Sequence, residues 1–264
     1  SPADGNSDAI IAMDLVTGEK LWVSQQTEDD AWNTACLSDY TDDDANCPEE
    51  NGPDYDFGSS PMLLTLPDGS DVVVGGQKSG AVMALDPDTG EMLWKIQVGR
   101  GGVQGGIHFG MAAEGAQAYI PINDMIYPED AVRYGSERPP RPGLYALDVA
   151  TGDILWSAPA VDVCGDLENC DPGISHAITA VPGAVVAGYL DGRLRIHDTS
   201  DGTVVWELNT LQEFDTVSGV SARGGSFSGG GGLVADGMLY MNSGYGLYGH
   251  MPGNVLLALG PRDD

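Results

Sequence analysis

One pattern of apolar and polar positions occurs four times along the chain. In each copy, a strand of mainly apolar residues ends at an aspartate, a glycine follows four residues later, and a tryptophan follows eight residues after the aspartate. The aspartates lie 72, 62 and 50 residues apart, so the unit is constant while the segments between copies vary. Such repetition indicates a repeat architecture. The four pairs are Asp14 with Trp22, Asp86 with Trp94, Asp148 with Trp156, and Asp198 with Trp206.

The residue types in this unit predict a β-hairpin. The aspartate carboxylate can accept hydrogen bonds from the backbone of the turn, and the glycine supplies the positive φ that a hairpin with a bulge needs. The tryptophan can pack a large face against the neighbouring unit. Two further β-rich runs precede a copy, for example residues 60–65 and 72–76 before residues 81–86. Four antiparallel strands in every ~50–70 residues predict an all-β fold of propeller blades.

The order of the strands predicts an incomplete ring. Residues 9–22 supply the last two strands of a blade, three four-stranded blades follow, and a final partial blade of three strands runs to Leu259. Residues 1–264 then form about four blades, with units that end near the four tryptophans. We expect this domain to be half of a ring, with the other blades on another chain or on a preceding region.

Composition excludes several classes of function. The 264 residues carry 40 acidic and 11 basic side chains, a net charge of −29, and nucleic-acid binding depends on clustered lysine and arginine. No apolar run approaches the roughly 20 residues of a membrane-spanning helix. The acidity fits a well-solvated surface, and it also fits adaptation to salt or to calcium. Composition alone does not separate these explanations.

Four cysteines indicate the compartment. They allow three pairings, and the simplest closes two short loops with disulfides Cys36–Cys47 and Cys164–Cys170. Neither spacing is typical of zinc, redox or covalent haem sites. Disulfides persist in oxidising surroundings, which predicts a periplasmic or extracellular protein.

The unit A-x-D-x-x-T-G-x-x-x-W resembles the tryptophan-docking repeat of quinoprotein dehydrogenases, which bind pyrroloquinoline quinone (PQQ) on an eight-bladed propeller. Five other segments resemble the polyvinyl alcohol dehydrogenase-like branch of that family. They are residues 29–33 (DDAWN), 54–61 (DYDFGSSP), 75–80 (GGQKSG), 100–110 (RGGVQGGIHFG) and 242–254 (NSGYGLYGHMPGN).

This resemblance implies that the chain is the C-terminal half of a PQQ-dependent alcohol dehydrogenase. Such an enzyme would oxidise a secondary or polymeric alcohol by hydride transfer to PQQ and pass the electrons to a cytochrome c. It would also use Ca²⁺, with ligands mostly outside this chain, and an N-terminal half of the propeller as partner. The alternative is a non-catalytic propeller that serves as a scaffold or ligand-binding module.

The long loops, by strand counting, share the face opposite the short D-x-x-x-G turns, and a binding site belongs there. Lys78 lies in one of these loops, where the resemblance implies a cation that hydrogen-bonds the quinone oxygens. The resemblance also implies that Trp32 binds the cofactor and that Asn33 takes the position of the family's catalytic aspartate. Because an amide is a poor base, Asp29 or Asp30 is an alternative base.

Further cofactor-binding candidates occupy the same face. Arg223, Gly224 and Gly225, and also Arg100, put cations beside flexible backbone that suits the carboxylates of PQQ. His108 could cover a flat ring or move a proton. Each candidate has a structural alternative, such as a glycine that only turns the chain. We expect Lys78→Met to slow quinone reduction far more than it loosens the fold, because a change in a surface turn costs within about 0.5 kcal/mol of stability.

Overall fold

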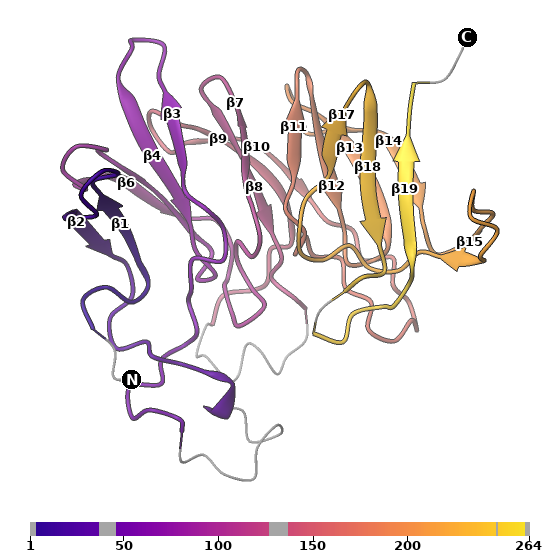
Figure 1. Cartoon of the computed structure of the whole chain (residues 1–264), viewed down its shortest axis with the longest axis horizontal. Helices are drawn as coiled ribbons and strands as arrows, with labels where there is room; N and C mark the ends of the chain where they lie inside the picture. The colour runs from indigo at the N-terminus through magenta and orange to yellow at the C-terminus, as the bar shows by residue number, and fades with distance from the viewer. Residues whose placement is uncertain (1–3, 37–45, 127–136, 247, 262–264) are drawn as a thin grey trace.

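The computed structural model describes residues 4–36, 46–126, 137–246 and 248–261, which form an all-β structure. Figure 1 shows its sheets side by side in chain order, from β1 at one end to β19 at the other. The first sheet contains β1 (Ala9–Met13) and β2 (Lys20–Gln25), and a short 3₁₀ helix, η1 (Thr34–Cys36), follows it. No helix in the described ranges is long and apolar enough to cross a membrane.

Three four-stranded sheets make up the centre of the chain, and each is antiparallel in chain order. The first contains β3 (Met62–Thr65), β4 (Asp71–Gly76), β5 (Ala81–Leu85) and β6 (Met92–Gln97). The next contains β7 (Ala112–Glu114), β8 (Gln117–Ile122), β9 (Gly143–Asp148) and β10 (Ile154–Pro159). The third contains β11 (Thr179–Val181), β12 (Ala184–Gly188), β13 (Arg193–Asp198) and β14 (Val204–Asn209).

A three-stranded sheet completes the described chain, with β17 (Leu233–Ala235), β18 (Met238–Ser243) and β19 (Val255–Leu259). These sheet sizes agree with the strand count that the repeat predicts. An additional hairpin of β15 (Glu213–Phe214) and β16 (Ala222–Arg223) lies in the link before this sheet, and the sequence pattern does not reveal it.

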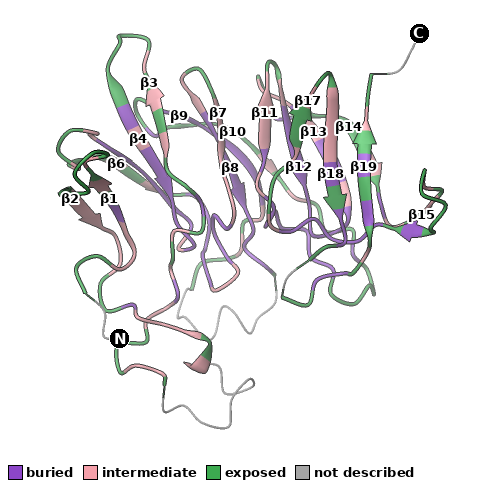
Figure 2. Ribbon diagram, in the orientation of Figure 1, coloured by how far each residue is buried: buried purple, intermediate pink, exposed green. Residues whose placement is uncertain are grey.

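The hydrophobic core is divided into layers between neighbouring sheets. Along β8, Ala118 and Ile120 face the sheet of β3–β6, while Tyr119 packs toward the sheet of β11–β14. Successive residues of a strand point to opposite faces of its sheet. A strand in a sheet that packs between two other sheets therefore needs apolar residues on both faces. Figure 2 shows the result: buried residues concentrate in strands such as β4, β8 and β12.

The repeat tryptophan joins each sheet to the next. Trp94 of β6 donates its indole N–H to the carbonyl of Val149 in the following sheet at 2.9 Å, and its ring covers Gly152 of that sheet's D-x-x-x-G turn. Trp22 and Trp156 make the same contact with the next turn along. The aspartate of each turn caps the backbone as expected; Asp86, for example, accepts the N–H of Thr89 at 2.9 Å. The repeat is thus a docking device between sheets.

The first strands of two neighbouring sheets, β7 and β11, contact each other. The β3–β4 and β7–β8 turns lie along the upper edge in Figure 1, while longer connections lie along the lower edge. Both expected disulfides, Cys36–Cys47 and Cys164–Cys170, are present in these connections. The second packs against Met251 and Leu211 and so ties two links together.

The tryptophan contact can be tested with a pair of glycine variants. We expect Gly152→Ala to destabilise the protein by about 1–3 kcal/mol more than Gly18→Ala, because the new Cβ would lie 2.7 Å from Trp94. Both glycines have a similar positive φ (77° and 72°), but Gly18 has nothing within 4 Å of the added Cβ. Urea denaturation of both variants measures the difference, and equal destabilisation would contradict the docking role.

Candidate functional site

Lys78 lies in the turn between β4 and β5, held between the loop before β3 and the link after β6. Its backbone N–H donates to the carbonyl of Asp56 at 3.1 Å, and its carbonyl accepts the N–H of Gly102 at 3.3 Å. The link approaches so closely that a Cβ on Gly106 would lie 2.4 Å from the Lys78 carbonyl oxygen. The backbone around Lys78 is therefore fixed by three separate segments.

The ammonium group of Lys78 binds two carboxylates. Its Nζ lies 2.7 Å from Oδ2 of Asp54 and 3.2 Å from Oδ2 of Asp56. The side chains of Lys78 and Asp54 are 8% and 4% exposed, whereas that of Asp56 is 61% exposed. The expectation that replacing Lys78 costs as little as a surface-turn change is therefore wrong, because its charge is buried in an ion pair.

The two carboxyl groups differ in protonation. Burial raises the pKa of Asp54 to about 8, hydrogen bonding with Asp56 acts in the same direction, and Lys78 opposes both. Burial also acts to raise the pKa of Asp56, but hydrogen bonding with Asp54 and the charge of Lys78 outweigh it and leave that pKa below its usual value. The pair thus shares one proton at neutral pH, and Asp56 is the ionised and accessible member.

Asp30, the alternative base, holds this carboxylate pair in place. It is buried, and its carboxylate accepts the N–H of Tyr55 at 2.8 Å and that of Asp54 at 3.2 Å. The carbon of that carboxylate would lie 2.5 Å from a Cβ on Gly52, so the loop passes directly over it. Its observed contacts orient the segment that carries Asp54 and Asp56.

The side chain of Asn33 binds the local backbone, and the backbone N–H of Trp32 faces the carboxylate of Asp30. Asn33 accepts the N–H of Ala35 at 2.8 Å, which caps η1, and donates to the carbonyl of Asn46 at 3.1 Å. The N–H of Trp32 lies 3.5 Å from Oδ1 of Asp30. Among the described residues, neither side chain hydrogen-bonds Lys78, so the amide at the expected base position supports the disulfide loop while two other carboxylates meet the cation.

His108 extends the site on the other side of Lys78. Its Nδ1 lies 2.7 Å from the hydroxyl of Ser175, and its ring contacts Phe109 at 4.2 Å between centroids. Burial, with the nearby charge of Lys78, lowers the pKa of His108 to about 3, although the charge of Asp56 acts the other way. The ring is therefore neutral at neutral pH and offers a buried hydrogen-bonding group beside the ion pair.

Arg223 ends β16, and Gly224 and Gly225 follow it. β16 pairs with β15, which Figure 1 shows at the opposite end of the row of sheets from β1. Arg223 is exposed, and its backbone is tied to Asn254 by hydrogen bonds of 2.9 and 2.8 Å. A Cβ on Gly224 would lie 2.3 Å from the carbonyl oxygen of Thr210. Both glycines are explained by the close packing of links, and the cofactor role of these three residues stays a prediction.

In the described part of the chain, no group of three or more His, Cys, Asp or Glu side chains is arranged to hold a metal ion. The expected Ca²⁺ and its ligands thus stay a prediction.

Comparison with known proteins agrees with the repeat. A family model described as outer membrane protein assembly factor BamB, which covers PQQ-like repeats, matches residues 6–246. The chain belongs to this family of PQQ-like repeat proteins. Among solved structures, this family member is similar in fold to a europium-containing methanol dehydrogenase, with a TM-score of 0.57 and 14% identity over 94% of this chain and 45% of that one.

Two curated relatives are alcohol dehydrogenases by name. The PQQ-like repeat chain is 44% identical to a polyvinylalcohol dehydrogenase of Pseudomonas sp over 90% of its own length and 36% of that protein. It is 37% identical to a 1-butanol dehydrogenase (cytochrome c) of Thauera butanivorans over 27% of its length and 11% of that protein. The chain therefore spans little more than a third of the first relative.

Asp54 and Asp56 are the site residues that sequence reasoning missed. They lie two positions apart in the segment DYDFGSSP, so one cation can meet both. The signal was a pair of acidic residues before a strand in a chain with only three lysines. It could not be recognised because 22 residues separate Asp56 from Lys78, and only the folded turn brings them together.

The buried ion pair predicts a stability effect. We expect Lys78→Met to lower the free energy of unfolding by about 1–3 kcal/mol at pH 7.5, because the buried Asp54 loses its hydrogen-bond donor and the ionised Asp56 loses its cation. Lys95→Met is the matched control, since Lys95 hydrogen-bonds only the amide of Gln26 at an exposed position and should cost less than about 1 kcal/mol. Urea denaturation measures both, and similar small losses would show that the ion pair is not buried in solution.

The shared proton predicts a pH dependence. The folded-state pKa of Asp54, about 8, lies above the usual aspartate pKa of 3.8, so its contribution to stability is present below pH ~4 and is lost as pH rises through about 8. Asp54→Asn should therefore flatten the fall in unfolding free energy between pH 5 and pH 8.5. Asp8→Asn is the comparison, since burial raises the pKa of Asp8 only to about 7 and its effect should end at lower pH. An unchanged slope in Asp54→Asn would contradict the shared proton.

Proposed function

We propose that this chain carries part of the active site of an extracytoplasmic quinoprotein alcohol dehydrogenase. The observation that carries the proposal is the Lys78–Asp54–Asp56 cluster, which sets a cation and an accessible carboxylate side by side on the loop face. The relatedness to a polyvinylalcohol dehydrogenase over 90% of the chain supports the reaction class. The two disulfides support a periplasmic or extracellular location.

The residues around Lys78 fit PQQ in one specific respect. An ammonium group has three N–H donors, and Asp54 and Asp56 occupy two of them, which leaves one for an oxygen of a ligand. The neutral ring of His108 and the adjacent glycine backbone add hydrogen-bonding groups without adding bulk. When bound, the quinone supplies the acceptor for the hydride of the alcohol.

Asp56 takes the proton of the alcohol in this proposal. Oxidation of an alcohol releases a hydride from carbon and a proton from the hydroxyl oxygen, and an ionised carboxylate within reach can accept that proton. Asp56 is the accessible member of the pair, and the proton already on Asp54 keeps Asp56 ionised. Lys78 holds the carboxylates in place and stabilises negative charge on the oxygen of the ligand that it binds.

The names of the relatives suggest a substrate and an electron acceptor. We propose a secondary or polymeric alcohol as substrate, as the name of the Pseudomonas relative suggests, and a cytochrome c as electron acceptor, as the name of the Thauera relative suggests. We also propose that further blades, supplied by an N-terminal half, complete an eight-bladed ring and provide the Ca²⁺ ligands.

A scaffold function is the second candidate. The matching family model is described by an assembly factor, so the same repeat also occurs in a protein that is not named as an enzyme. The two candidates differ in what they require of Asp56, because a scaffold has no use for an accessible carboxylate beside a buried cation.

Substitution of the carboxylate separates the two. In the full-length protein loaded with PQQ, we expect Asp56→Asn to lower kcat for alcohol oxidation with a dye acceptor by about 10²–10⁴, the usual contribution of a general base. Asn33→Ala is the control, because Asn33 binds only local backbone, and it should keep kcat within about threefold of the parent. Equal loss in both variants, or loss in Asn33→Ala alone, would return the base role to the segment around Asn33, and no activity in the parent would favour the scaffold.

A further inference from the structure

A cavity of about 350 Å³ opens beside the end of the outer strand β6. Its walls come from the end of β6 and the following link, and from the segment that precedes β9. The lining residues are Gln97, Val98, Gly99, Arg100, Arg138, Pro139 and Arg141. We propose that this cavity is a binding site for a small oxyanion, a carboxylate or a phosphate group.

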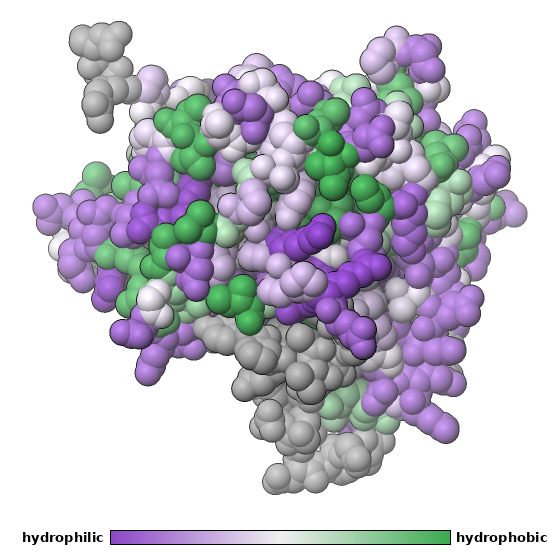
Figure 3. Space-filling view, turned by 180° about the vertical axis from the view of Figure 1, so that it is seen from behind, coloured by the Kyte–Doolittle hydropathy of each residue, from purple (hydrophilic) through white to green (hydrophobic). Residues whose placement is uncertain are grey.

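The lining of this cavity is rich in arginine. Among the described residues that line this cavity, three are arginines and none is acidic, in a chain with 40 acidic and only 11 basic residues. A second cavity, of about 310 Å³ between β10 and β13, contains a carboxylate as well as arginines. There, Arg193 and Arg195 both pair with Glu207, so the cations are already neutralised. Figure 3 shows the reverse side of the molecule, where strongly hydrophilic side chains lie next to apolar ones.

One buried carboxylate positions two of the arginines. Oδ2 of Asp124 accepts the backbone N–H of Arg100 and, at 3.0 Å, that of Arg141, which belongs to a different segment. Oδ1 accepts the N–H groups of Gly101 at 3.0 Å and Gly106 at 2.9 Å. Four backbone donors therefore surround this carboxylate and offset its charge, and the cavity wall is held in a fixed shape.

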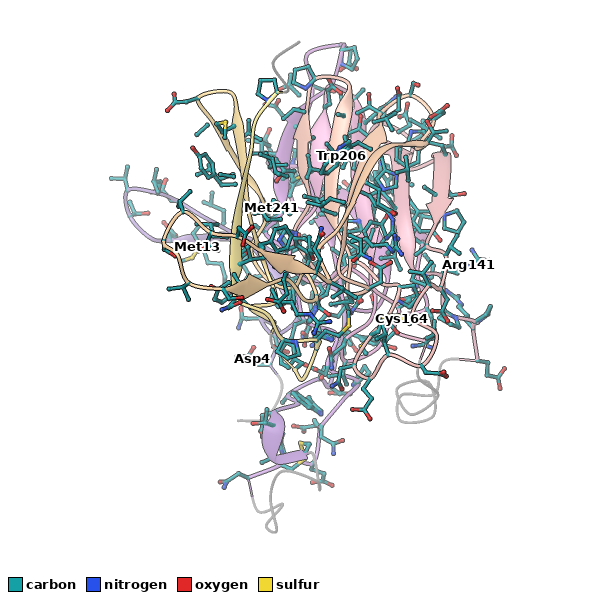
Figure 4. All side chains as sticks on the ribbon, turned by 90° about the vertical axis from the view of Figure 1, so that its right-hand side faces the viewer. Asp4, Met13, Arg141, Cys164, Trp206 and Met241 are labelled. Carbon is teal, nitrogen blue, oxygen red and sulfur yellow. A yellow bond between two sulfur atoms is a disulfide. The ribbon has the colours of Figure 1, made fainter. Side chains whose placement is uncertain are left out.

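The guanidinium of Arg100 is fixed and buried. Its Nε donates to the carbonyl of Gly101 at 3.2 Å and its Nη2 to the carbonyl of Met125 at 2.8 Å. A buried cation is normally paired, yet neither Arg100 nor Arg141 has a carboxylate partner among the described residues. Arg141 is exposed at the margin of the molecule (Figure 4). An anion can therefore enter past Arg141 and reach the wall that contains Arg100.

Size and geometry define the ligand class. Arginine binds carboxylate and phosphate groups through paired N–H donors in a planar fork. A volume of 350 Å³ lies at the lower end for small-molecule pockets, which favours a small polycarboxylate or a phosphate monoester over an extended polymer. The inference does not depend on the proposed dehydrogenase activity, since none of the lining residues binds Lys78, Asp54 or Asp56 directly among the described contacts.

Calorimetry with two probes tests the site. Citrate and inorganic phosphate are titrated separately into the intact protein without PQQ at about 0.15 M NaCl, which screens the net negative charge. We expect saturable binding of at least one probe at one site. Arg141→Gln should weaken that binding at least tenfold, and Arg138→Gln should weaken it in the same direction. Tighter binding of citrate identifies a carboxylate ligand, and tighter binding of phosphate identifies a phosphate ligand.

Lys95→Gln is the matched control. It removes one positive charge from β6, the strand that ends at the cavity, and Lys95 does not line the cavity. Its affinity for either anion should stay within twofold of the parent, and its unfolding midpoint should match that of Arg141→Gln. Absence of saturable binding of both probes would overturn the proposal. So would an equal loss in Lys95→Gln and Arg141→Gln, since that would show general attraction and not a site.

Discussion

The contact of an indole ring with the glycine of the next turn is the interaction on which the rest of this structure depends. It is made by Trp22, Trp94 and Trp156, each with its indole N–H bonded to a backbone carbonyl at 2.9 Å. The glycine has to lack a side chain because the ring occupies that space. The contact sets the spacing between sheets, and the apolar layers between them fill the gap that it leaves.

Because the sheets stack rigidly, the connections along the lower edge in Figure 1 can differ in length and sequence. Segments far apart in the sequence meet there, and two of these meeting points contain a buried carboxylate that binds backbone N–H groups. Asp30 orients the loop that carries Asp54 and Asp56, and Asp124 holds the links that carry Arg100 and Arg141. Part of the acidity of the chain is therefore structural. The same device builds both the Lys78 cluster and the arginine-lined cavity.

The sequence predicted the fold well and the site only in part. Periodicity and the Asp–Gly–Trp spacing are local signals, so the sheets, the turns and both disulfides could be predicted. Lys78 was recognised by its place in a strand turn, but its partners were not, because pairing with Asp54 depends on how a long loop folds back. Asn33 was expected at the base position from the tryptophan beside it, whereas its amide caps η1. The hairpin β15–β16 is too short to leave a periodic pattern.

The most direct measurement is native mass spectrometry of the full-length protein incubated with PQQ, for the parent and for Lys78→Met. The account predicts one PQQ bound per protein in the parent, and clearly weaker retention in the variant because the donor to the quinone oxygen is gone. Failure of the folded parent to bind PQQ would contradict the account. Equal retention by the two proteins would also contradict it, since Lys78 would then take no part in holding the cofactor.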